Sequence, residues 1–429
     1  MHDDCKSGFC RNSLVSIVVV IRHLTESFNT ALRPFETRLF GLLWFSFLLA
    51  NSCMWMFDSA ATWLLVERGA SPFFIALVQT ASTLPVFLLG LPSGALADII
   101  DRRKLYLFTQ AWLCAVAFAM MLMIELSQIN AWVILILTFI NGIGLSLRWP
   151  VYASIVPMVL PQKSMQQAFA LNSAAMNLSR ILGPVLAGWI LWRFSSGSVY
   201  LVIASISGFI FLLLYRSPMP VFISSKSREP FLKFVREGIR RSFFNEEVRQ
   251  VLILVSIFFF AGISVVALAA VLATTRMGAG PLSYALLLSS IGLGAVFSVF
   301  LLPLINNIFR ERTVFIFAVC GQALTIGALS LTYFPGLIFF LFFSSGFLWV
   351  IVVSLLTVSI QLLLTNEYRA RGMAIYQLCL MGGSALGAAL WGGIATVFGL
   401  EATFFVSGVT ILICLLPRYP LVQKASVSF

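Results

Sequence analysis

One polar turn decides how this chain folds; it reads Gly94-Ala-Leu-Ala-Asp98-Ile-Ile-Asp101-Arg102-Arg103. It interrupts two apolar runs, residues 72–97 and 104–126, and each is long enough to cross a bilayer as a helix of roughly 20 residues. Acids and bases in the turn need water, whereas the flanking runs need an apolar solvent. We therefore predict two membrane-spanning helices joined by a short loop in water.

The composition extends this interpretation to the whole chain of 429 residues. Hydrophobic residues make up 60% and charged residues only 10%. A soluble domain is about a quarter charged, because its surface faces water. The composition therefore excludes a soluble enzyme, a disordered chain, a coiled coil and a secreted disulfide scaffold. The seven cysteines and two histidines form no ligand cluster, so we predict no metal site and no structural disulfide.

Apolar runs of spanning length recur along the chain and predict an all-α membrane protein with twelve transmembrane helices. The predicted spans are residues 39–66, 72–97, 104–126, 131–158, 165–192, 198–216, 248–274, 282–307, 313–333, 336–363, 373–398 and 402–418.

A single long polar segment divides these spans into six and six. The predicted parts are an N-terminal tail (1–38), a six-helix bundle (39–216), a basic linker (217–247), a second six-helix bundle (248–418) and a C-terminal tail (419–429). An offset of 204 residues aligns the fifth helix of each bundle, and it places Gly183 on Gly387 and Gly188 on Gly392. Two parallel repeats with a substrate site between them are a transporter arrangement.

The distribution of Lys and Arg among the loops predicts how the chain is oriented in the membrane. The chain has a formal net charge of +12. With both termini inside, the loops on the cytoplasmic side hold 23 Lys and Arg residues, and the outer loops hold only Arg68, Arg193 and Arg276. The positive-inside rule therefore predicts cytoplasmic termini. It also explains the positive charge without a nucleic acid partner.

The turn at residues 94–103 resembles the signature loop of the major facilitator superfamily, with Ile99 in place of a basic residue and Asp101 in place of a glycine. The acid before the arginine pair, the fragment at residues 234–238 and the segment 278–287 are similar to the superfamily's enterobactin-exporter-like branch, the transmembrane secretion effectors. The resemblance implies two pseudo-symmetric six-helix bundles. It also implies a gating latch made by Gly94, Asp98, Asp101, Arg102 and Arg103. The alternative is a basic turn that only fixes the topology.

The fifth span resembles the superfamily's antiporter motif, and its small residues include Gly183, Pro184 and Gly188. Such residues let helices approach closely, and proline weakens the local hydrogen-bond ladder. Gly387 and Gly392 would do the same in the second bundle. The resemblance implies a flat face on which the two bundles rock; the alternative is ordinary small-residue packing.

Three ionisable residues lie inside predicted spans, where charge is costly and marks candidate functional sites. We expect Asp58 to bind a proton, and Arg148 and Arg180 to attract an anionic substrate or to neutralise Asp58. The alternative is a static ion pair, or side chains that reach out to water. Further polar contacts to the substrate are expected from Asn141, Asn172, Asn177, Tyr376 and Gln377.

These features predict a secondary transporter that exports a small amphipathic or anionic compound, siderophore-like or drug-like, in exchange for protons. An importer or lysolipid flippase on the same fold is the alternative, and a transport-inactive receptor a remote one. We expect no enzymatic activity and no cofactor beyond the proton gradient, since the chain has no nucleotide-binding motif. We also expect a monomer, in a bacterial inner (plasma) membrane, whose partners are its substrate and the lipid bilayer.

Overall fold

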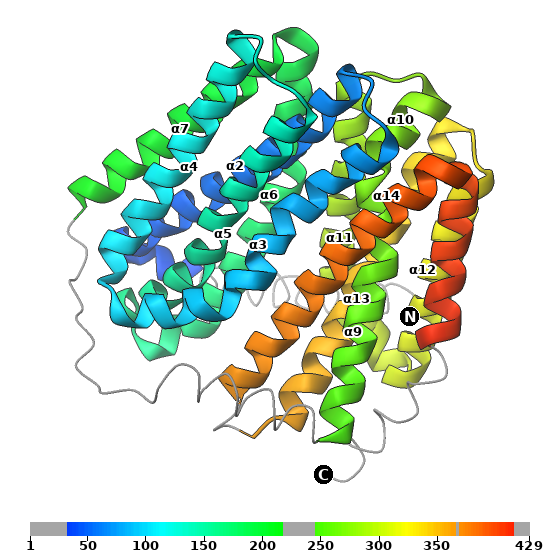
Figure 1. Cartoon of the computed structure of the whole chain (residues 1–429). Helices are drawn as coiled ribbons and strands as arrows, with labels where there is room; N and C mark the ends of the chain where they lie inside the picture. The colour runs from blue at the N-terminus through cyan, green and yellow to red at the C-terminus, as the bar shows by residue number, and fades with distance from the viewer. Residues whose placement is uncertain (1–31, 218–244, 366–368, 416–429) are drawn as a thin grey trace, which may run out of the picture.

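The computed structural model describes residues 32–217, 245–365 and 369–415 (Figure 1). Within these ranges every regular element is a helix. The predicted tails and the basic linker fall almost entirely on residues 1–31, 218–244 and 416–429, which lie outside the described residues.

Six long helices form the N-terminal half. They are α2 (Arg38–Glu67), α3 (Pro72–Ile99), α4 (Arg102–Glu125), α5 (Ala131–Val159), α6 (Met165–Arg193) and α7 (Ser196–Arg216), with short 3-10 turns at Arg33–Glu36 and Gln162–Ser164. The C-terminal half is built from α9 (Glu246–Ala267), α10 (Ala269–Met277), α11 (Pro281–Ile308), α12 (Glu311–Leu331), α13 (Pro335–Leu363) and α14 (Arg369–Leu415).

Helix α14 contains two spans. Its 47 residues would extend about 70 Å as one rod, more than twice the thickness of a hydrocarbon core. Gly399 breaks it with φ 79° and ψ 174°, a conformation open to glycine because it has no Cβ. Counted with this break, the described residues contain twelve spans, so the predicted fold is confirmed.

The seventh span differs from the prediction of one helix over residues 248–274. It is interrupted at Leu268, which separates α9 from α10. No glycine or proline lies at the break, so the sequence carries no local signal for it. The break redirects α10 so that it packs on α2 and α3 of the other half.

Each half repeats the same packing. In the first, α2 packs on α6, α3 on α5 and α4 on α7. In the second, α9 packs on the first part of α14, α11 on α13, and α12 on the second part of α14. The halves meet through α3 against α14 and α6 against α11 (Figure 1).

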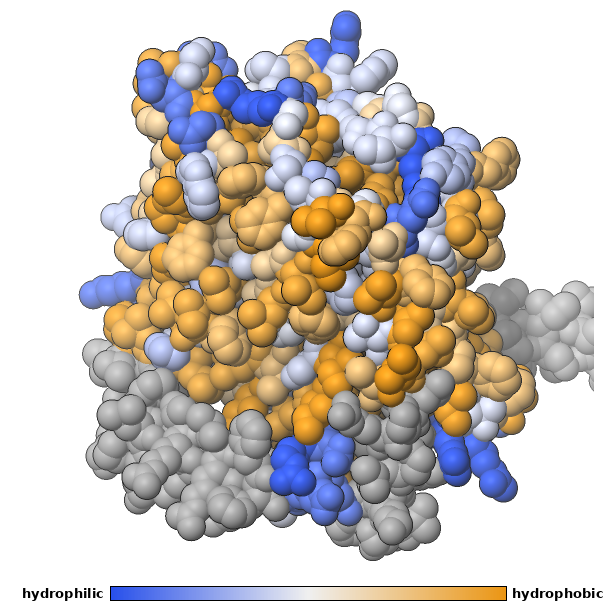
Figure 2. Space-filling model, turned by 45° about the vertical axis from the view of Figure 1, so that its right-hand side comes forward, coloured by the Kyte–Doolittle hydropathy of each residue, from blue (hydrophilic) through white to orange (hydrophobic). Residues whose placement is uncertain are grey.

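The molecule has two polar ends and an apolar middle. Figure 2 shows hydrophobic residues across the middle of one face and hydrophilic residues gathered at its two ends. Large apolar side chains such as Phe300, Phe317 and Leu324 are about 70% exposed, which suits lipid and not water. We call the end where α2 begins and α14 ends the terminal face, and the opposite end the distal face.

Candidate functional site

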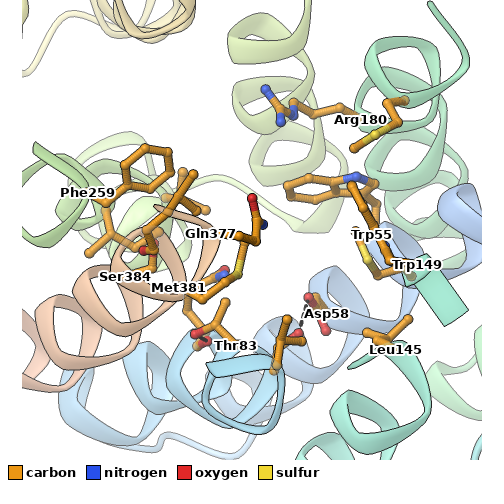
Figure 3. A pocket seen from close by; sticks show the side chains of 18 of the residues that line it. Trp55, Asp58, Thr83, Leu145, Trp149, Arg180, Phe259, Gln377, Met381 and Ser384 are labelled. Carbon is orange, nitrogen blue, oxygen red and sulfur yellow. Dashed lines mark hydrogen bonds between the residues drawn. The ribbon is translucent and has the colours of Figure 1, made fainter. Parts of the chain in front are cut away.

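A cavity of about 470 Å³ lies between the two halves (Figure 3). Its walls come from α2, α3, α5 and α6 on one side and from α9, α11, α13 and α14 on the other. On α3 its lining continues to Gly94, near the terminal face, and on α5 it includes Trp149 and Pro150, which lie in the terminal half of that helix. The cavity therefore extends from mid-membrane toward the terminal face.

Asp58 is the acid of this cavity. Its side chain is only 9% exposed, and its Oδ2 accepts a hydrogen bond of 2.8 Å from the Ser82 hydroxyl of α3 (Figure 3). Its Oδ1 has no hydrogen-bond partner among the described residues. A carboxylate with an unpaired oxygen in a low-dielectric site is costly, so this oxygen requires either a proton or a donor from a bound molecule.

Arg180 is the cation of this cavity and lies on α6. Its guanidinium carbon lies 5.4 Å from the centre of the Trp55 ring, a cation–π contact. No ion pair to Arg180 occurs among the residues that the structure describes, and its Nε has no hydrogen-bond partner there. Because Trp55 and Asp58 are one helical turn apart on α2, an acid, an aromatic ring and a cation follow one another along one wall.

The charge of the cavity is confined to the N-terminal half. The offset of 204 residues carries Trp55 to Phe259, Asp58 to Gly262 and Arg180 to Ser384, and all six of these residues line the cavity. The described lining residues of the C-terminal half are uncharged. Beside Gly262, the Trp349 ring fills the space that a side chain would need, with its Cζ3 2.4 Å from an ideal Cβ position.

Arg148 points away from the cavity lining. It is 1% exposed, and its guanidinium donates to the Ala50 carbonyl at 2.9 Å and to Asn51 Oδ1 at 3.2 Å, both on α2. The next two residues, Trp149 and Pro150, line the cavity in its place. This geometry makes Arg148 a tie between α5 and α2.

Of the five polar residues expected to contact a substrate, one lines the cavity. Gln377 extends into it from α14 (Figure 3). Tyr376 is buried against Thr357, with 3.0 Å between their hydroxyl oxygens, and Asn172 accepts a hydrogen bond from the Tyr152 hydroxyl at 2.9 Å. Two remain on their own helices away from the lining: Asn141 is buried in α5, and Asn177 donates to the Ser173 carbonyl.

The turn at residues 94–103 ties three helix ends together. Asp101 caps the N-terminus of α4 by accepting from the Arg103 amide at 2.9 Å. Arg102 donates to the Ser154 carbonyl of α5, and Arg103 to the Tyr215 carbonyl of α7 at 2.8 Å. These contacts lie within the N-terminal half. The predicted latch acid, Asp98, has a side chain outside the described residues.

The four predicted packing glycines lie at four close helix contacts. Ideal Cβ atoms on Gly183 and Gly387 would meet α2 and α9 of their own halves, at 2.5 Å from Trp55 Cβ and 2.1 Å from the Phe260 carbonyl. Those on Gly188 and Gly392 would meet the opposite half, at Ala285 of α11 and Ala76 of α3. Pro184 is buried beside Gly183. The inter-half glycine contacts lie near the distal face, where they close the cavity.

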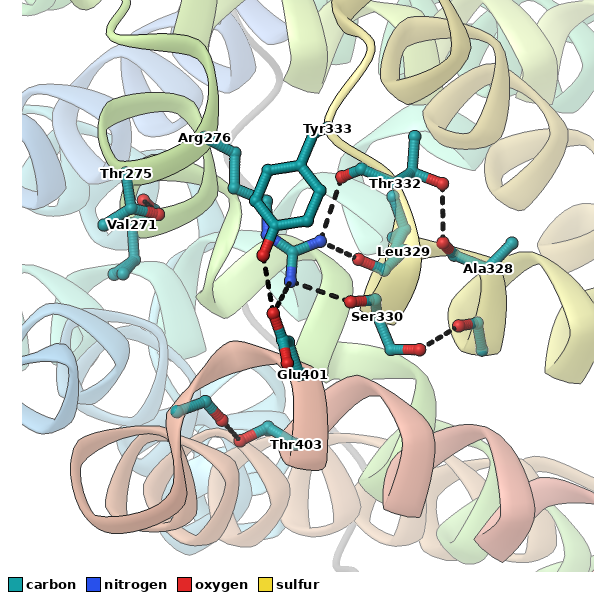
Figure 4. Close-up of polar contacts among 12 residues, drawn as sticks. Val271, Thr275, Arg276, Ala328, Leu329, Ser330, Thr332, Tyr333, Glu401 and Thr403 are labelled. Atoms are coloured by element: carbon teal, nitrogen blue, oxygen red, sulfur yellow. Dashed lines mark hydrogen bonds and ion pairs between the residues drawn. The ribbon is translucent and has the colours of Figure 1, made fainter.

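A polar cluster fixes the distal end of the C-terminal half (Figure 4). Arg276 of α10 donates to the carbonyls of Leu329, Ser330 and Thr332 at the end of α12. Glu401 lies 3.8 Å from the guanidinium and accepts from the Tyr333 hydroxyl at 2.5 Å. Because it accepts this bond and carries negative charge, Glu401 raises the pKa of Tyr333 above its usual value.

Comparisons with known proteins agree with this architecture. Residues 29–424 match the family model described as transmembrane secretion effector, within the major facilitator superfamily. The chain belongs to this family. The resemblance first seen in the turn at residues 94–103 is thus confirmed, for both family and fold. The chain is a membrane transporter of the major facilitator type.

Relatives of this transporter include exporters. It is 21% identical over 375 residues to macrolide efflux protein A of Streptococcus pyogenes, covering 85% of this chain and 91% of that protein. It is 27% identical over 161 residues to the staphyloferrin A transporter of Staphylococcus aureus, covering 37% and 40%. The solved structure of the nucleoside transporter NupG superposes with a TM-score of 0.74 at 11% identity, over 90% of this chain and 99% of that one, and so shares the fold.

Sequence reasoning about this transporter missed several cavity residues. Ser82, the donor to Asp58, is one of many serines, and nothing in its surroundings distinguishes it. Trp349 and Phe259 are hidden among 10 Trp and 40 Phe. The repeat offset could have found Phe259 and Ser384, because it carries Trp55 and Arg180 onto them.

Proposed function

We propose that this transporter exports amphipathic small molecules from the cytoplasm and exchanges them for protons that bind at Asp58. The observation that carries the proposal is the free Oδ1 of Asp58, buried in the wall of a cavity between two similar halves. We assign the terminal face to the cytoplasm because the Lys and Arg of the loops gather there. The cavity then takes up substrate from the cytoplasmic side.

Alternating access is supported by where the halves touch. The close contacts of Gly188 with Ala285 and of Gly392 with Ala76 lie near the distal face, whereas the cavity extends toward the terminal face. Rocking of the halves about the midplane site would separate these contacts and close the terminal side. Separation would also break a few hydrogen bonds between the halves, such as the one from the Phe73 amide to Thr396 Oγ1 at 2.9 Å and the one from the Ser289 hydroxyl to the Ile181 carbonyl at 3.0 Å.

The cavity favours an amphipathic substrate. Most of its lining is apolar, and its aromatic side chains are Trp55, Trp149, Phe259 and Trp349. Its polar groups are few: Asp58, Arg180, Gln79, Gln377 and several hydroxyls. An apolar body would lie against the rings, and a polar group would reach the wall of the N-terminal half. The similarity to macrolide efflux protein A supports such substrates.

Exchange follows from the single carboxylate. The unpaired Oδ1 is satisfied either by a proton or by a hydrogen-bond donor or cation of the substrate, and each excludes the other. The form with neither is the costly one. If the carrier changes between its two states only when Asp58 holds either a proton or the substrate, it exchanges protons for substrate.

Arg180 supports a second candidate. Its guanidinium lacks an acidic partner among the described residues, so an anionic substrate could bind there while Asp58 holds a proton. Proton and substrate would then move in the same direction, which is the coupling expected of a proton-driven importer. The similarity to the staphyloferrin A transporter supports a siderophore as the bound molecule, and that protein's name gives no direction of transport.

Proteoliposomes distinguish these candidates. A pH-sensitive dye inside vesicles reports proton movement when a macrolide is added, and in the wild type we expect protons to move opposite to the macrolide. Asp58→Asn should reduce this movement about tenfold or more, the effect of about 1.4 kcal/mol. Glu401→Gln, which neutralises an acid at the distal surface that is 64% exposed, should retain it. Proton movement alongside the substrate would favour the second candidate, and coupling that survives Asp58→Asn would remove Asp58 from the mechanism.

A further inference from the structure

A second, much smaller space lies on the distal side of Asp58. It has a volume of about 10 Å³, which is room for about one water molecule. We call it the distal pouch. Its lining residues come from both halves: Trp55, Asp58, Ser59, Thr62, Ile75 and Gln79 from the first, and Val266, Ala267, Tyr284 and Leu288 from the second. Asp58 thus borders the main cavity and the distal pouch at once.

The distal pouch is polar where it meets Asp58. Ser59, Thr62, Gln79 and Tyr284 bring three hydroxyls and an amide to its wall, all on side chains that are buried or half-buried. The titratable or charged side chains near Asp58 are Tyr284 of α11, Tyr200 of α7 and, further along the same wall of the main cavity, Arg180. No second acid lies among the described residues that line either space. Asp58 is therefore the carboxylate that a proton entering the pouch would neutralise.

Tyr284 closes the distal side of this pouch. It is 3% exposed, and its ring stacks on Trp63 of α2 with centroids 6.0 Å apart and planes 21° apart. Trp63 in turn donates to Glu67 Oε1 at 2.9 Å, and Glu67 accepts from Ser196 at the distal surface. The stack joins the two halves, because α11 belongs to one and α2 to the other. Separation of the halves at the distal face would therefore pull Tyr284 away from the pouch.

We propose that the distal pouch is the route by which protons from the distal side reach Asp58, and that the Tyr284 ring is its lid. A carrier must present the same binding group to both sides in turn, and the main cavity serves only the terminal side. The pouch lies in the opposite direction from the same carboxyl group, and hydroxyls with water pass protons through hydrogen bonds. This inference rests on the proposed function, in which Asp58 binds the transported proton.

A proton-leak measurement needs no substrate and tests the lid directly. Purified variants in proteoliposomes, with a valinomycin-driven membrane potential and a pH-sensitive dye inside, report passive proton entry. Tyr284→Ala removes the lid, and we expect proton entry to rise at least about fivefold above wild type, the ratio that corresponds to about 1 kcal/mol. Tyr284→Phe keeps the ring on Trp63 and removes only the hydroxyl, so proton entry should not rise above the wild-type rate. Tyr106→Ala deletes an equally buried tyrosine that lines neither space, and it controls for general loosening.

The double variant Tyr284→Ala with Asp58→Asn identifies the path. If protons pass through the pouch to Asp58, the added substitution should return proton entry to the wild-type rate. A leak that persists in the double variant, or one of equal size in Tyr106→Ala, would overturn the proposal. So would a monodisperse Tyr284→Ala protein with no leak. If wild-type coupling is present in the macrolide assay but the lid variants behave as wild type, the route alone is wrong; if wild-type coupling is absent, the proposed function is.

Discussion

Gly392 of α14 approaches Ala76 of α3 so closely that a Cβ atom on the glycine would lie 2.5 Å from the alanine Cβ. Real Cβ atoms do not come this near, so only glycine permits the contact. The pseudo-symmetric contact of Gly188 with Ala285, at 2.3 Å, closes the other side of the same interface. The distal closure of this transporter therefore depends on two missing methyl groups.

Gly392→Ala should weaken distal closure and shift the carrier toward the state open at the distal face. A shift of about 1 kcal/mol changes the ratio of the two states about fivefold. We would measure it with a cysteine at Ile75, a buried residue of the distal pouch, in a background without native cysteines, labelled by a membrane-impermeant thiol reagent from the distal side. The matched control is Gly393→Ala, whose Cβ would meet only Phe73 at 3.9 Å. Equal labelling of both variants would contradict the prediction.

Arg180 and Arg148 should respond differently to the same substitution. Arg148→Gln removes a buried guanidinium that holds the Ala50 carbonyl and Asn51, so we expect the free energy of unfolding to fall by about 1.5–3 kcal/mol. Arg180→Gln removes a half-buried cation without an ion-pair partner in the described ranges, so stability should change little while affinity for anionic substrates falls. Thermal unfolding and substrate binding, measured on both variants, check the pair. Loss of binding in Arg148→Gln at unchanged stability would place that residue in the site instead.

Gly262→Ala should narrow the cavity from the side of the C-terminal half. The added methyl group would lie 2.4 Å from the Trp349 ring, which must then move into the cavity that it lines. We expect transport of bulky substrates to fall more than transport of small ones, measured as relative uptake rates across a size series. Gly262→Ala combined with Trp349→Phe, which shortens the ring, should restore bulky substrates. Uniform loss across the series would indicate general destabilisation.

Arg276 should matter more for stability than its acidic partner. Arg276→Ala leaves the carbonyls of Leu329 and Ser330 without their donor and frees α10 from α12, at a cost of about 1.5–3 kcal/mol. Glu401→Gln should lower the melting temperature only slightly, because Glu401 is 64% exposed and water screens its charge. A larger loss in Glu401→Gln than in Arg276→Ala would reverse this assignment.

The contact between Tyr333 and Glu401 predicts that stability falls at alkaline pH. Since Glu401 raises the pKa of Tyr333 above its ordinary value of 10.0, the tyrosine contact is intact below pH 10 and is lost as the pH rises through the raised pKa. Tyr333→Phe should remove that part of the alkaline transition in a thermal-unfolding series above pH 10. An unchanged transition would show that the contact does not contribute to stability.

The family, and all of the spans except the break in the seventh, follow from local patterns in the amino-acid sequence. Apolar runs of spanning length are local, and lipid leaves the backbone of each no alternative to a helix. The same reasoning gave Asp58 and Arg180 as costly charges, and both line the cavity. It could not separate Arg180 from Arg148, because depth along a helix is local whereas the direction of a side chain depends on its neighbours.

Which polar groups lie in the same cavity depends on how distant helices pack, and this is visible only in the folded structure. Ser82 reaches Asp58 from another helix, and Tyr284 covers it from the other half, 226 positions further along the chain. The break at Leu268 is likewise seen only in the structure, because no glycine or proline marks it in the sequence; beyond it, α10 packs on α2 and α3. The apolar pattern of a helix shows which residues can lie in lipid. Which faces of two helices contact each other is set by close packing between residues far apart in sequence.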